Sequence, residues 1–216
     1  MRRLAALLFA IATAAAQPAH GRPEVPSAVW APPQVELPKK WPQPTIPNPM
    51  ITRITVAGAR ITLESTNLET IRKRFGAAAG RQGDAGDAIT WLCFHGKDDG
   101  GAWGLWLTSS EIDGTAIGGF KWQRLPANAS IDPRCKSLDQ ATSAIILPIP
   151  IHLGLAESQV DAVMGKPSGR YHGISIYVHE HNLTLHNEPY SADNTVLVSY
   201  RNGALWSIAA DYTISS

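Results

Sequence analysis

An excess of charge of either sign is what this sequence most clearly lacks. Its 216 residues carry 19 Lys and Arg against 18 Asp and Glu, for a net charge of +1. Loss of Arg2 and Arg3 with the leader predicted below would leave 17 basic residues against the same 18 acidic ones. A near-neutral chain gives no electrostatic reason to bind nucleic acid or an anionic membrane. We therefore expect no nucleic-acid partner.

Motifs of several enzyme classes are also missing. The sequence has no Gly-x-Ser-x-Gly elbow, no phosphate-binding glycine loop and no HExxH zinc motif. Its isolated carboxylates are expected in turns or at strand ends, where solvation explains them; they include Asp84, Asp87, Asp98 and Glu111. A glycosidase-like pair among them stays open without geometry. The prediction is a non-enzymatic protein with no catalytic residue and no cofactor.

Long hydrophobic runs are scarce, and the longest lies at the N-terminus. Arg2 and Arg3 precede an apolar run over residues 4–15, which is short for a membrane span. The small residues 14–16 then offer a cleavage site. We predict a signal peptide over residues 1–16, export to the periplasm or medium, and no stable membrane insertion after cleavage. An uncleaved anchor helix is the alternative.

Cysteine is limited to Cys93 and Cys135. Export to an oxidising compartment favours pairing them, and each is the other's one possible intramolecular partner. Closing a loop of this length would stabilise the fold by about 4 kcal/mol in the chain-entropy model, as an upper value. Two separate buried thiols are the alternative.

Proline, in contrast, is concentrated in one stretch. Residues 17–50 contain ten of the sixteen prolines. Proline removes backbone donors and fixes φ, so this stretch is predicted to be extended and semi-rigid rather than packed. We interpret it as a spacer whose Trp30 and Trp41 attach to the domain; a ligand for a proline-recognising groove is the alternative.

The rest of the chain contains a loose internal repeat. Ile61, Gly76 and Ile89 have counterparts 90, 89 and 85 residues later, each at the same place in a helix-then-strands order. A repeat of this size is typical of one supersecondary unit used twice. We predict an α+β fold of two tandem modules, 51–135 and 136–216, each with one helix packed on a three- to four-stranded antiparallel sheet. Each module is expected to have its own hydrophobic core, with the join near residues 136–148.

Local signals support these elements. Residues 66–69 form a predicted capping box, and Gly76 and Gly165 are predicted to end the two helices. Strands are expected over 89–94, 103–107, 116–125, 174–178, 196–200 and 204–212. Asn202-Gly203 is a strong hairpin signal between the last two.

The stretch from Leu153 to Pro167 resembles the helix signature of small outer-membrane lipoproteins of the SmpA/OmlA type, with an opening glycine, a mid-helix valine and a closing Gly-x-Pro. Used in tandem, the unit resembles the beta-lactamase inhibitory protein fold, over about residues 52–214. The resemblance implies two helix-plus-sheet modules and inhibitor-like binding. The chain departs from the lipoproteins in having no cysteine for lipid attachment near the cleavage region.

Aromatic residues cluster on the predicted strands. If aliphatic faces meet the helices, alternation places several rings on the uncovered face of the sheet. We predict a binding surface there of Trp91, Trp106, Trp122 and Tyr177, each partly exposed, because Trp and Tyr dominate interface hot spots. Packing between the modules is the equally weighted alternative.

Histidines are concentrated late in the chain, with His179, His181 and His186 close together. His179 and His181 would project from the same strand face, as two metal ligands must. A polar strand end without a metal has the same sequence pattern, so no metal site is assigned.

These observations favour an exported, non-enzymatic binding protein that recognises a protein or cell-envelope component through an aromatic sheet surface. A periplasmic metal-binding or hydrolytic protein that uses the histidine-rich second half is the alternative.

Overall fold

The computed structural model describes residues 28–34, 38–40, 42–43, 50–84, 88–110, 115–138, 145–185 and 188–215. The predicted signal peptide, Trp41 and His186 therefore lie outside the described residues. Neither described helix is long and apolar enough to cross a membrane.

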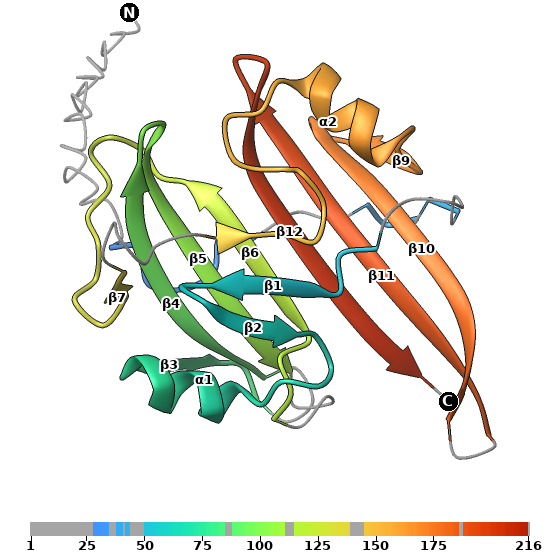
Figure 1. Cartoon of the computed structure of the whole chain (residues 1–216), viewed down its shortest axis with the longest axis horizontal. Coiled ribbons are helices and arrows are strands. Elements are labelled where there is room, and N and C mark those ends of the chain that lie inside the picture. The colour runs from blue at the N-terminus through green and yellow to red at the C-terminus, as the bar shows by residue number, and fades with distance from the viewer. Residues whose placement is uncertain are drawn as a thin grey trace, which may run out of the picture.

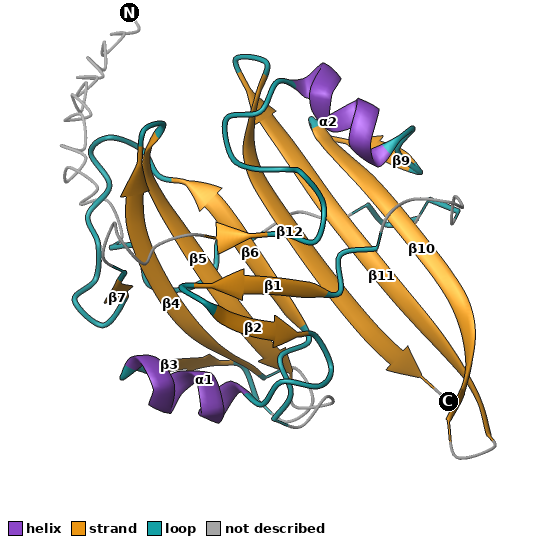
Figure 2. Cartoon of the chain, in the orientation of Figure 1, coloured by secondary structure: helices purple, strands orange, loops and turns teal. Residues whose placement is uncertain are grey.

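One large antiparallel sheet dominates the molecule (Figures 1 and 2). Along the sheet its strands are β3 (Ala79–Gln82), β4 (Ile89–Asp98), β5 (Gly101–Ser110), β6 (Gly119–Arg124), β12 (Ala204–Ser215), β11 (Glu188–Arg201), β10 (Ile174–Leu185) and β9 (Gly169–Tyr171). A ninth strand, β7 (Lys136–Ser137), pairs with β4 in parallel. In each half the strands follow one another in chain order from the edge of the sheet to its centre. The last strands of the two halves, β6 and β12, therefore pair at the centre.

The predicted fold class is wrong. The described chain is mostly β-strand with two short helices, and its two halves share one nine-stranded sheet instead of forming two helix-on-sheet modules. The pairing of β6 with β12, from Gly119↔Asp211 to Gln123↔Ser207, makes the sheet continuous. Backbone groups on these two strands satisfy each other, so no sheet edge separates the halves.

A second layer covers one face of the large sheet, called here the inner face. It contains a small sheet of β2 (Ala59–Thr62), β1 (Arg53–Val56) and β8 (Ile145–Ile146), with α1 (Leu68–Phe75) and α2 (Glu157–Met164). Both helices and the small sheet lie in front of the large sheet in Figure 1. The opposite face is called the outer face.

The main core lies between these two layers. It contains Ile71 of α1 and Val160 of α2 in one contiguous cluster with Leu92, Val196 and Ile208 of the large sheet. The predicted pair of separate cores is therefore wrong. Each helix does lie against strands of its own half, α1 against β4 and β5 and α2 against β12.

Local signals fared better than the fold class. Gly76 caps α1 in the left-handed region at φ 57°, which suits glycine, and Gly165 caps α2. Asn202 and Gly203 both have positive φ in the β11–β12 turn. The predicted capping box of Thr66 and Glu69 is wrong: the N-cap of α1 is Asn67, whose side chain accepts the N–H groups of Glu69 and Thr70, and the Glu69 carboxylate binds Arg72 instead. The Thr66 hydroxyl instead accepts the N–H of Thr62.

Candidate binding surface

The four aromatic residues predicted to form an exposed surface are buried. Trp91, Trp106, Trp122 and Tyr177 expose 3%, 0%, 4% and 1% of their surface. They also lie on different faces, since Trp122 and Tyr177 belong to the inner core and Trp91 and Trp106 to a separate outer cluster. The predicted partial exposure is wrong, and these four residues cannot form one open surface in this arrangement.

Tyr177 shows why the strand faces were misassigned. It faces the inner core, whereas Ile174, Ile176 and Val178 alternate with it and point to the outer face. Burial raises the pKa of the Tyr177 hydroxyl to about 12, and the negative charge of Asp161 adds to this. An aromatic ring therefore fills the space under α2 that an aliphatic side chain was expected to fill.

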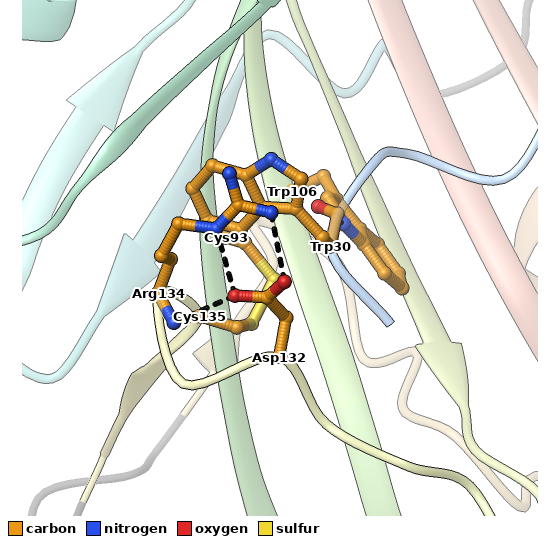
Figure 3. The surroundings of a disulfide bond; sticks show 6 residues. All are labelled: Trp30, Cys93, Trp106, Asp132, Arg134 and Cys135. Atoms are coloured by element: carbon orange, nitrogen blue, oxygen red, sulfur yellow. Dashed lines mark hydrogen bonds and ion pairs between the residues drawn. A yellow bond between two sulfur atoms is a disulfide. The ribbon is translucent and has the colours of Figure 1, made fainter. Parts of the chain in front are cut away.

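The outer cluster is built on the disulfide. Cys93 and Cys135 are bonded, which confirms the predicted pairing, and both are buried beside Trp91, Trp106 and Leu125. Figure 3 shows the disulfide with Trp30, Trp106 and the Arg134–Asp132 ion pair around it. A disulfide is typical of proteins that fold in oxidising compartments.

Part of the proline-rich stretch covers this cluster. Residues 28–34, called here the strap, lie on the outer face, and the prediction that the stretch is unpacked is wrong for them. Val29 donates its N–H to Ser130 O (2.7 Å) and accepts from the N–H of Asp132 (3.2 Å), in a parallel bridge with Ile131. The attachment of Trp30 to the domain is confirmed, with its ring edge-on to Trp91 at 5.9 Å between centroids.

Two side chains of the sheet also bind carbonyls of the strap. The Trp106 Nε1–H donates to Trp30 O at 3.0 Å, and Lys121 Nζ donates to Pro33 O at 3.1 Å. These donors come from paired positions of β5 and β6. The Arg134 guanidinium lies over the Trp30 ring, 4.4 Å from its centre, in a cation–π contact.

A cavity of about 390 Å³ lies beside the strap, over the centre of the sheet. Strap residues Pro32, Pro33 and Gln34 line one side of it. The sheet side is lined by residues of β5, β6, β11 and β12 that include Thr108, Lys121, Thr195, Leu197, Ala209 and Asp211. A smaller hollow of about 210 Å³ shares Gln34, Lys121, Leu197 and Ala209 with it. The cavity and the hollow therefore both lie where β6 pairs with β12, around the amine of Lys121.

Lys121 is the distinctive group of this cavity. Its amine is half-buried, and burial lowers its pKa from 10.5 to about 8. Asp211 is exposed at the rim, where its carboxylate accepts a hydrogen bond from the Thr213 hydroxyl at 3.2 Å. A partly desolvated amine of this kind attracts an anionic or carbonyl oxygen more strongly than a fully hydrated one.

The histidine pair is only partly assembled as a metal site. His179 and His181 share a strand face with ring centroids 5.4 Å apart, as predicted. Burial lowers the pKa of His179, and the nearby His181 lowers it further. Within the described ranges, no group of three His, Cys, Asp or Glu residues is placed to hold a metal ion.

The sequence predicts the attachment of Trp30 to this outer surface but not the burial of Lys121. Trp30 stood out as an aromatic residue among prolines, which was a sufficient signal for attachment. Lys121 carried no signal, because its burial depends on the strap and on the β6–β12 pairing. The four aromatic residues were chosen by strand alternation, which cannot tell which face another segment covers.

Comparison with known proteins does not assign a family. No protein-family model, no curated protein and no solved structure matches this chain. The resemblance to the SmpA/OmlA and beta-lactamase inhibitory proteins therefore stays a prediction.

Proposed function

We propose that this chain is an exported, non-enzymatic binding protein that recognises a protein of the cell envelope or its surroundings through the outer face of its large sheet. The cavity around Lys121 is the observation that carries this proposal. It lies at the centre of the sheet, at the join of the two halves, where both halves contribute to one surface.

The side chains around this cavity suit a protein partner. Thr195, Leu197 and Ala209 are half-buried in a row across β11 and β12, so a docking segment can remove their remaining surface from water. Interfaces typically combine such an apolar centre with a few polar groups that fix orientation. Lys121 supplies the positive charge at this centre, and we expect an acidic side chain of the partner to pair with it.

Capture from an envelope extract tests the proposal when matched variants are compared. Leu197→Glu introduces a charge at the proposed surface, whereas Ile146→Glu introduces the same charge on exposed β8, in the inner layer (57% exposed). The wild type and Ile146→Glu should retain a protein that Leu197→Glu loses at least tenfold. That protein, once purified, should bind the wild type directly in a defined ratio.

The opposite outcome is equally clear. Retention of the same proteins by all three immobilised chains, or direct binding insensitive to Leu197→Glu, would remove the outer face as the recognition surface. Circular dichroism and thermal melting of each variant would first establish that the fold is intact.

A further inference from the structure

The strap is held in the way that proline-rich ligands are held by recognition domains. Its prolines have no N–H to give to a sheet, so the segment around them is bound through carbonyl oxygens instead. Trp106 and Lys121 supply donors to carbonyls of Trp30 and Pro33, three residues apart. Aromatic-lined grooves are the usual means of binding such segments.

The groove has a distinct pocket for an aromatic side chain. Trp91, Trp106, Leu125 and the disulfide form its floor, and the ring of Trp30 enters it from the outer side. Trp30 is only half-buried there. A segment bound in this groove therefore has an aromatic residue two positions before a Pro-Pro pair. The residue after the pair, Gln34 in the strap, lies at the cavity around Lys121.

We propose that this groove recognises, in another protein, an extended proline-rich segment of the form aromatic-x-Pro-Pro-acidic, and that residues 29–34 occupy it in cis until such a segment displaces them. This inference rests on the proposed function and names the chemistry of the partner. The acidic position follows from charge complementarity with Lys121.

The fit of the strap shows why it can be displaced. Among the described residues, Pro32, Pro33 and Gln34 line only one side of the cavity, and the Gln34 side chain is exposed. A segment with Glu at that position would add a charge-assisted hydrogen bond to the Lys121 amine. The cis strap has the advantage of a high effective concentration, so a ligand in trans must make better contacts or meet a weakened strap.

A peptide binding experiment on the full chain tests this. The probe is a fluorescein-labelled peptide of residues 28–34 with Gln34→Glu, followed by anisotropy. Trp30→Ala weakens the strap and leaves the floor of the pocket unchanged. We expect the Trp30→Ala chain to bind the peptide at least tenfold more tightly than the wild type, whose own strap competes.

Two double variants separate the groove from non-specific binding. Trp30→Ala/Trp106→Phe keeps an aromatic ring but removes the N–H donor, and it should bind at least tenfold more weakly than Trp30→Ala. Trp30→Ala/Trp122→Phe makes the same change on the inner face and should bind like Trp30→Ala. A scrambled peptide should not bind.

Several results would overturn the inference. One is a folded Trp30→Ala chain that fails to bind the peptide at millimolar concentration; another is binding unaffected by Trp106→Phe. If Trp30→Ala does not fold, Val29→Pro serves instead, because it removes the N–H donated to Ser130 O and leaves the pocket intact. A dimer seen by light scattering, without peptide binding, would indicate that two copies exchange straps. That result would also exclude a segment of another protein as the ligand.

The two proposals fail separately. Loss of the purified partner with Leu197→Glu, without any peptide binding, would retain the recognition surface and reject the proline-rich ligand. Peptide binding together with a partner that is insensitive to Leu197→Glu would retain the proline-rich ligand and reject the recognition surface around Leu197.

Discussion

The indole N–H of Trp106 donates a hydrogen bond to the backbone carbonyl of Trp30, 76 residues earlier in the chain, at 3.0 Å. Trp106 is fully buried, and Trp30 lies on the strap. The bond therefore connects the floor of the outer cluster to the segment that covers it. Two of the other buried indoles, Trp91 and Trp122, have no hydrogen-bond partner for Nε1 among the described residues.

This difference predicts unequal costs for the same substitution. Trp106→Phe should lower the free energy of unfolding by about 1–2 kcal/mol more than Trp122→Phe, because only the first removes a formed hydrogen bond. Both lose similar ring volume, so the comparison isolates the N–H group. Urea unfolding followed by circular dichroism measures both values, and equal losses would contradict the hydrogen bond.

The sequence predicted the local features of this fold well. Glycine at positive φ ends α1, Asn202-Gly203 makes the final hairpin, and the two cysteines pair, because each depends on neighbouring residues or on a choice with one solution. The strand positions followed from alternation for the same reason.

The larger arrangement could not be predicted in this way. The pairing of β6 with β12 depends on hydrogen bonds between segments about 90 residues apart, and no local pattern records which strands become neighbours. Strand alternation also could not show which face each side chain takes, because the strap covers part of the outer face and the helices cover the inner one. Trp91 was expected to be exposed for that reason, and it is covered by Trp30.

Asn194 is a second long-range link whose loss should be costly. It is 1% exposed; its Oδ1 accepts the N–H of Ile51 at 2.9 Å, and its Nδ2 donates to Asp211 O at 2.8 Å and Ile51 O at 3.3 Å. Asn194→Leu keeps the volume and leaves these backbone groups without their partner. We expect a loss of about 3 kcal/mol in the free energy of unfolding.

The neighbouring Thr195 provides the control. Its side chain is half-buried on the outer face of the same strand, so Thr195→Val should change the free energy of unfolding by about 0.5 kcal/mol or less. A similar result for Asn194→Leu in denaturant unfolding would show that the Ile51 contact contributes nothing.

The disulfide should stabilise the fold mainly by restricting the unfolded chain. Cys93→Ala/Cys135→Ala should lower the free energy of unfolding by about 2–4 kcal/mol, since a loop of 42 residues is opened. Alkylation of the denatured protein without reductant should add no label in intact-mass measurement, because denaturation exposes both positions. Reductant should destabilise the wild type and have no effect on the double variant; two added labels on the unreduced protein would refute the bond.

Lys121 should make stability depend on pH in the alkaline range. Burial lowers its pKa to about 8 in the folded protein, against the usual value of 10.5 that applies to the unfolded chain. Between these two pH values the unfolded chain binds more protons than the folded one, so the free energy of unfolding rises with pH there. Below pH 8 both states hold the charged amine, and the cost of burying its charge is present in full.

Comparison with Lys121→Met removes the contribution of every other group. The free energy of unfolding of the wild type minus that of Lys121→Met should increase from pH 8 towards pH 10.5 and be flat between pH 6 and pH 7. Urea unfolding at each pH measures this difference, with Lys97→Met as the control because Lys97 is exposed at the end of β4. A flat difference for Lys121→Met across the whole range would mean that the amine is hydrated as well in the folded protein as in the unfolded chain. In that case the strap does not bury it, and the cavity lacks the partly desolvated amine on which the proposed recognition depends.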